Sequence, residues 1–140
     1  MVKKVIPLVL VLILSMTVIV VGAQAIDASG TCGADLTWSL SGTTLTISGE
    51  GAMTNYYGGD APWYNFRSSI ANVVIEDSVE TIGDNAFYGL SNMGRVTIGS
   101  SVTTIGESAF NSCTSLARVT LPDTLVSIGS SAFSNCSSLS

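Results

Sequence analysis

The stretch Ile82-Gly83-Asp84-Asn85-Ala86-Phe87 recurs at residues 105–110 and again at residues 128–133, each time with the pattern Ile-Gly-x-x-Ala-Phe. Neighbouring copies keep a constant 23-residue interval. A second motif, Val-x-Ile or Val-x-Leu, keeps the same interval and begins at Val73, Val96 and Val119. Self-similarity at a fixed interval of this size predicts a repeat protein, in which each unit buries its apolar side against its neighbours.

Each unit contains one short strand signal. Val96 and Ile98 alternate with Thr97, so the apolar side chains are expected to face the core and the threonine to face solvent. Residues 119–121 have the same alternation. An apolar residue three positions before each strand completes the leucine-rich repeat pattern, whose units are about 20–29 residues long. These positions are Ile70, Met93, Leu116 and Leu139.

The sequence therefore predicts an α/β-type solenoid that is mainly β, a leucine-rich repeat stack of 23-residue units with parallel strands. The stack is expected to occupy residues 70–140 as about three units, the last of them truncated. A polar residue such as Asp84 just before each Ala-Phe pair predicts a turn that leads into a short, capped helical segment. This segment would form the convex side.

The pattern I-G-x-x-A-F-x-x-C-x-x-L-x-x-V-x-I resembles the BspA-like leucine-rich repeats of bacterial surface proteins. Upstream, residues 30–38, 45–49 and 61–63 are similar to the segment that precedes such repeats in secreted members. The resemblance implies a bacterial source, a secreted or cell-surface location, and adhesion or protein recognition rather than catalysis. It identifies no ligand.

The N-terminal segment, residues 1–25, is interpreted as a signal peptide. Lys3 and Lys4 precede an apolar run over residues 5–21, and Ala23-Gln24-Ala25 provides a small-x-small cleavage site. Cleavage after Ala25 leaves no expected membrane span. The alternative is that residues 5–21, which are nearly long enough to cross a bilayer, stay uncleaved as an anchor.

Residues 26–69 are expected to form an N-terminal cap with a β-hairpin and an aromatic loop. Residues 36–40 and 44–48 alternate apolar and polar side chains around Ser41-Gly42-Thr43. The loop at residues 51–66 carries six aromatic or methionine side chains and favours a plug for the core over a sugar-stacking platform.

Composition excludes several classes of function. After removal of residues 1–25, three arginines stand against ten acidic residues, a formal net charge of −7, which disfavours nucleic acid as a partner. The chain has no histidine, the usual general base of nucleophilic hydrolases. Glu76, Asp77 and Glu80 cluster in the first unit, but the aligned positions of later units are not consistently acidic, so a solvated turn is favoured. No enzymatic activity, cofactor or metal site is predicted.

Cys113 and Cys136 occupy one column of the repeat, and Leu90 takes the same position in the first unit. Stacked strands are close enough for a disulfide, so a bridge between these two cysteines is one alternative. Two free core thiols are favoured, because unpaired cysteine is commonly buried and because leucine substitutes for it here.

The outward side chains of the strands form the candidate binding face, which consists of Asn72, Val74, Arg95, Thr97, Arg118 and Thr120. The two stacked arginines suit carboxylate or sulfate groups of an unknown protein or glycan partner. The opposing interpretation is that each arginine only solubilises a strand and pairs with a nearby acid. The alternative function is a structural spacer without a ligand. Because the last unit lacks a polar cap, we expect a fragment of a longer protein, and the oligomeric state stays open.

Overall fold

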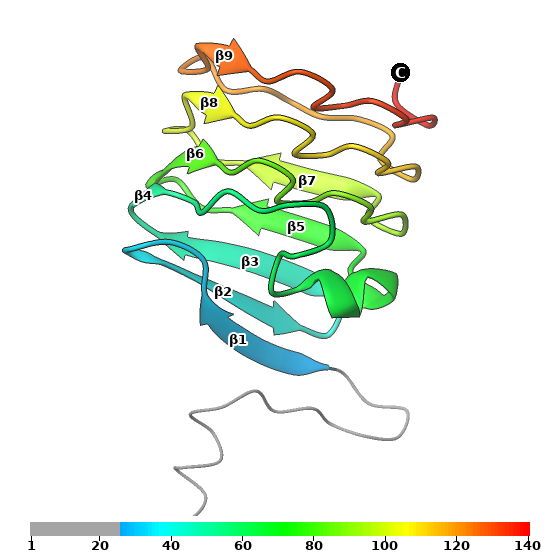
Figure 1. The fold of residues 1–140 in the computed structure, drawn as a ribbon, viewed down its shortest axis with the longest axis horizontal. Coiled ribbons are helices and arrows are strands. Elements are labelled where there is room, and N and C mark those ends of the chain that lie inside the picture. Colours follow the sequence, from blue (N-terminus) through cyan, green and yellow to red (C-terminus); the bar gives the residue numbers. More distant parts are fainter. Residues whose placement is uncertain (1–25) are drawn as a thin grey trace, which may run out of the picture.

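A computed structural model describes residues 26–140. The interpretation of residues 1–25 as a signal peptide, and that of residues 5–21 as an anchor, lies outside these residues. The described part of the chain is built on two sheets (Figure 1). The larger sheet has the order β1 (Asp27–Thr31), β2 (Leu36–Ser41), β3 (Thr44–Gly49), β5 (Asn72–Ile75) and β7 (Arg95–Ile98). The smaller sheet has the order β4 (Gly51–Ala52), β6 (Val79–Ile82), β8 (Thr104–Ile105) and β9 (Ser127–Ile128).

Strands β1, β2 and β3 are antiparallel, and β2 and β3 are the two strands that the alternation predicted. Gly42 lies in the turn between them at a φ of 61°, a conformation that glycine adopts without strain. Leu36, Trp38 and Leu40 of β2 are buried, while the residues between them are exposed. Period-two burial of this kind gives the sheet one core face and one outer face.

From β3 onward the sheet is parallel, which confirms the predicted parallel strands. Thr44 pairs with Asn72, and Asn72 pairs with Arg95. The first pairing spans a 28-residue interval and the second a 23-residue interval. The unit that begins at β3 is therefore five residues longer than the unit that begins at β5. This longer unit contains the 3₁₀ helix η1 (Tyr64–Ser69). Parallel pairing therefore starts earlier than residue 70, within the segment that the sequence assigned to the cap.

Outside the two sheets, successive units stack through aromatic rings in the segments that carry the Ala-Phe pairs. Trp63, Phe87 and Phe110 are fully buried. Ring centroids are 5.5 Å apart for Trp63 and Phe87, 5.2 Å for Phe87 and Phe110, and 5.3 Å for Phe110 and Phe133, with interplanar angles of 19°, 18° and 5°. The Trp63 indole also donates a 2.8 Å hydrogen bond to the carbonyl oxygen of Ala86. The phenylalanine column of the repeat is thus a continuous ring stack.

The prediction of a short helical segment around the Ala-Phe pair is wrong. Residues 84–89 form successive turns, and Asn85 has a φ of 54°, in the left-handed region. The N–H groups of Asn85, Phe87 and Gly89 donate instead to carbonyl oxygens in the next unit, those of Glu107, Ala109 and Asn111. The backbone is therefore satisfied between units rather than within a helix, and a left-handed residue in each turn prevents a helix from propagating.

The prediction of a strand at residues 119–121 is also wrong. β7 is the last strand of the larger sheet, and residues 117–122 run beside it without ladder pairing. Leu121 is 39 % exposed, whereas the equivalent Ile75 is 1 % exposed. The apolar side chain of this unit thus lacks the cover that the earlier units have, and β7 keeps an unpaired edge.

Candidate binding face

The outer face of the larger sheet carries the columns that the sequence predicted. In β5 and β7 the core-facing residues are Val73, Ile75 and Val96, all buried. Arg95 and Thr97 are exposed between them, and pairing places Arg95 beside Asn72 and Thr97 beside Val74. Four of the six candidate residues therefore lie on one sheet surface, in two rows that cross the strands.

Arg118 and Thr120 lie on the unpaired segment across from β7. Two adjoining hollows separate this segment from the strand. The first has a volume of about 480 Å³ and is lined by Gly94, Arg95, Val96, Thr97, Ala117, Arg118 and Thr120. The second has a volume of about 250 Å³ and is lined by Val96, Thr97, Ile98, Thr120, Leu121 and Pro122. Because Val96, Thr97 and Thr120 line both, the hollows form one continuous feature, here named the β7 groove.

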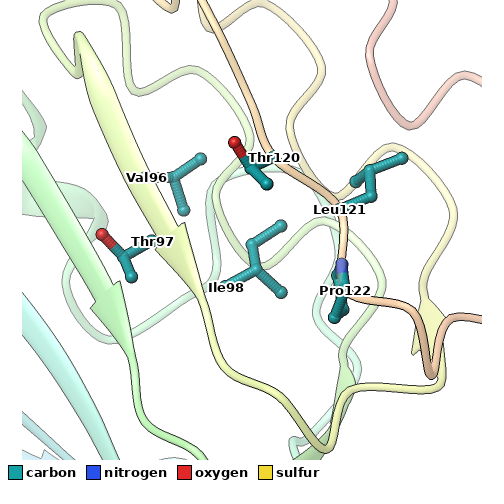
Figure 2. A pocket seen from close by; sticks show the side chains of 6 residues that line it. All are labelled: Val96, Thr97, Ile98, Thr120, Leu121 and Pro122. Carbon is teal, nitrogen blue, oxygen red and sulfur yellow. The ribbon is translucent and has the colours of Figure 1, made fainter.

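The β7 groove has side chains of two kinds. Figure 2 shows Val96 and Ile98 on one side of the strand and Thr97 on the other, with Leu121 and Pro122 across the gap. The apolar residues form its floor toward the core, and the threonines and arginines form its outer part. The structure thus brings Arg95, Thr97, Arg118 and Thr120 together around one groove. Asn72 and Val74 do not line it, because β5 lies on the opposite side of β7.

The two arginines are exposed and have no acidic partner. Within residues 26–140, no carboxylate oxygen lies within 4.0 Å of an arginine nitrogen. The third arginine, Arg67, instead places its guanidinium 4.3 Å from the centroid of the Tyr64 ring and donates a 3.1 Å hydrogen bond to the Tyr64 carbonyl oxygen. Arg95 and Arg118 therefore present charge at the groove that no intramolecular ion pair neutralises.

Sequence reasoning missed the contribution of the antiparallel strands to this surface. Pairing continues the two rows into hydroxyl-bearing side chains of β2 and β3, because Asn72 is beside Thr44 and Val74 is beside Thr46. Thr46 in turn pairs with Ser39. The signal was present in Leu45-Thr46-Ile47, which has the same apolar-polar-apolar alternation as the later strands, but its 28-residue interval hides it from a search at 23.

The aromatic loop contributes mainly to the core. Trp63 is fully buried, and its ring lies 5.8 Å from both Trp38 and Tyr56 in edge-to-face contacts. Tyr57 is 81 % exposed, but no second exposed ring stacks beside it among the described aromatic pairs. Burial raises the pKa of Tyr56 to about 12, which agrees with a place for its ring at the core. The loop therefore lacks the paired exposed rings of a sugar platform.

The acidic and cysteine positions act within the fold. Asp77 accepts a 3.0 Å hydrogen bond from the backbone N–H of Ser100, one unit away. Cys113 and Cys136 are free thiols, and each donates a 3.1 Å hydrogen bond to a phenylalanine carbonyl oxygen of the preceding unit, Phe87 and Phe110 respectively. The cysteine column thus adds a hydrogen bond to the packing that leucine supplies at position 90. In residues 26–140 no group of three or more acidic or cysteine side chains is placed to hold a metal ion.

Parallel strands that recur at a 23-residue interval are typical of a leucine-rich repeat protein. The family described as "BspA type Leucine rich repeat region (6 copies)" matches residues 60–140, more than half of the chain. The chain therefore belongs to the BspA-type leucine-rich repeat family.

Two solved structures are similar to the chain. A leucine-rich repeat protein from Eubacterium ventriosum ATCC 27560 superposes with a TM-score of 0.65 at 29 % identity, over 75 % of this chain and 28 % of that one. A leucine-rich repeat protein of T. pallidum gives a TM-score of 0.54 at 27 % identity, over 69 % of this chain and 51 % of that one. The chain thus spans between a quarter and about half of the length of these proteins. No curated protein matches it.

Proposed function

We propose that this chain is a non-catalytic recognition module, exported by a bacterium, that binds a protein or glycan at the cell surface. The observation that supports the proposal is the pair of exposed arginines, Arg95 and Arg118, beside the β7 groove without an intramolecular acid. A guanidinium binds carboxylate or sulfate groups through a planar fork of donors. A partner that carries such groups would find two cations on one side of an otherwise acidic chain.

The remaining architecture fits this role. We propose that the 23-residue units continue as a solenoid, that β1, β2 and β3 cap its first unit, and that residues 1–25 direct export and are removed. The outer sheet surface would then be the concave face of the solenoid, which repeat proteins commonly use for binding. In residues 26–140 no helix has the length and apolar character needed to cross a membrane.

A spacer function is the second candidate, and the backbone ladder between units favours it. N–H groups of one turn region donate to carbonyl oxygens of the next at distances of 2.7 to 3.0 Å, as in Phe87 to Ala109 and Ser108 to Ser130. Together with the ring stack, this ladder would give a stiff rod that holds other parts of a longer surface protein apart. A spacer needs no accessible charge on its sheet face.

A binding screen distinguishes the two functions. The full chain is produced from its own export signal, and the mass of the secreted product is measured, with a start at Ile26 expected. It is then immobilised and tested over a concentration series against purified extracellular proteins and a glycan array. Recognition predicts a saturable partner whose signal is lost in the double variant Arg95→Gln, Arg118→Gln and kept in Arg67→Gln. Absence of any saturable partner supports the spacer.

A further inference from the structure

The outer edge of β7 has backbone N–H and C=O groups that are free to pair with another strand. The N–H groups of Asn72 and Glu76 donate toward β3, so the groups of the alternate residues, Val73 and Ile75, face β7 and pair with those of Arg95 and Thr97. Backbone groups alternate in direction along a strand, so those of Val96 and Ile98 point away from β5, into the β7 groove. Among the described residues no backbone hydrogen bond joins Arg95–Ile98 to residues 117–122. Unpaired strand edges of this kind readily pair with a further chain.

The groove beside this edge has room and an apolar floor. Its two hollows, of about 480 and 250 Å³, follow β7 along its length. Val96 is buried, whereas Ile98 is only partly buried and Leu121 is 39 % exposed. A strand placed here would turn every second side chain toward Ile98 and Leu121 and cover them. Its other side chains would face outward.

The charge of the groove selects the outward side chains. Arg95 and Arg118 line its outer part and have no acidic neighbour within residues 26–140. An occupant with carboxylates at alternate positions would bring them to these arginines, and one with lysine or arginine there would be repelled. The apolar floor and the two arginines therefore favour an occupant strand in which apolar and acidic side chains alternate.

We propose that the β7 groove binds an extended peptide segment in which acidic and apolar side chains alternate, and that the segment adds as a strand to the edge of β7. The backbone N–H and C=O groups of Val96 and Ile98 form the ladder, Ile98 and Leu121 contact the apolar side chains of the peptide, and Arg95 and Arg118 bind its carboxylates. This inference rests on the proposed recognition function and specifies its partner. Strand addition at a free sheet edge derives affinity from main-chain hydrogen bonds and specificity from alternate side chains.

The probe is a fluorescein-labelled synthetic peptide, Gly-Ser-Glu-Val-Glu-Val-Glu-Ser-Gly, titrated with the full chain and followed by fluorescence anisotropy. Saturable binding is expected, and it should weaken as salt rises, because exposed charges are screened. The peptide with glutamine in place of each glutamate should bind about tenfold more weakly, the loss expected when charge-assisted contacts worth about 1.4 kcal/mol disappear. The double variant Arg95→Gln, Arg118→Gln should show the same loss, and Arg67→Gln should bind as wild type.

Two changes test the strand pairing itself. Ile98→Pro removes an edge N–H that points away from β5, and proline is tolerated at such positions. It should weaken binding about tenfold, whereas Ile98→Val, which keeps the N–H and a branched apolar side chain, should bind nearly as wild type. Peptides with N-methyl groups on the valines alone or on the glutamates alone keep every side chain and their charge. One of the two should lose binding to the unaltered chain, which tests pairing even if Ile98→Pro fails to fold.

Each unfavourable outcome has a distinct meaning. Equal binding by both N-methylated peptides and the parent peptide, or no saturable binding by the parent peptide, overturns strand addition. If a sulfated oligosaccharide binds instead, depends on Arg95 and Arg118, and binds Ile98→Pro as it binds the wild type, the inference fails while the proposed recognition function stands. If neither probe binds and the wider screen finds no partner, both fail.

Discussion

The ring stack makes a quantitative prediction about coupling between units. Phe110 lies between Phe87 at 5.2 Å and Phe133 at 5.3 Å and is fully buried. Stacked aromatic pairs contribute about 0.5–1.5 kcal/mol beyond the area they bury. Phe110→Leu keeps most of the burial but removes two such pairs, so the free energy of unfolding should fall by about 1–3 kcal/mol. Phe133→Leu removes one pair and should cost about half as much.

A double-mutant cycle isolates this coupling from the loss of volume. Phe87→Leu and Phe110→Leu are combined, and urea unfolding is followed by circular dichroism and by the fluorescence of the two buried tryptophans, Trp38 and Trp63. The expected coupling energy is about 0.5–1.5 kcal/mol. Phe87 and Phe133 are separated by a whole ring, so their cycle is the matched control and should be additive within about 0.5 kcal/mol. Additive behaviour of the adjacent pair, or equal coupling in both cycles, would refute the reasoning.

Three further predictions concern single positions in the units. Burial raises the pKa of Cys113 from 9.0 to about 12, with a smaller contribution from Cys136. Alkylation by iodoacetamide at pH 8 should therefore be about tenfold or more slower in the folded chain than in urea. The raised pKa also makes the folded state favour the protonated thiol, so this contribution to stability is complete below pH 9 and is lost as the pH rises toward 12. Thermal unfolding temperatures measured as a function of pH test this loss. Ser108 has a φ of 53°, so Ser108→Val should destabilise the chain by about 1–2 kcal/mol in urea unfolding while Ser108→Gly should not. A Cβ on Gly106 would lie 2.6 Å from the Asp84 nitrogen, so Gly106→Ala should lower the unfolding midpoint, whereas the same change at Gly94, with its nearest atom at 3.8 Å, should leave it unchanged.

Much of the fold could be predicted from the sequence because the repeat copies its core side chains at a constant interval. The alternation in Val96-Thr97-Ile98 determines which side chains face the core, and the structure agrees at each strand of the parallel sheet. The start of that sheet could not be found in this way. Five additional positions before β5 move Leu45 and Ile47 out of the 23-residue register, although their side chains pack like those of later units.

The turn regions show where local patterns fail. A polar residue before Ala-Phe is typical of a helix start, but its neighbours Asn85 and Ser108 adopt left-handed conformations that end any helix. The deciding interaction is a ladder between units, as between Phe87 and Ala109, which no short window of sequence contains.

The candidate face was partly predictable. Its columns follow from strand parity, so the alternation alone is enough to place Arg95 and Thr97 on the outer surface. That residues 119–121 leave β7 unpaired could not be predicted, since their sequence is as typical of a strand as that of β7 itself. The β7 groove exists only because this segment does not pair, and the position of Arg118 across from Arg95 follows from that.

The measurement that tests the central claim most directly is the binding isotherm of the full chain with the strongest partner from the extracellular screen, recorded in parallel for three proteins. These are the wild type, the double variant Arg95→Gln, Arg118→Gln, and Arg67→Gln, all shown to unfold at the same urea concentration. Recognition through the candidate face predicts saturable binding that the double variant weakens about tenfold or more and that Arg67→Gln keeps. Equal binding by all three proteins, or no saturable binding by the wild type, would contradict it.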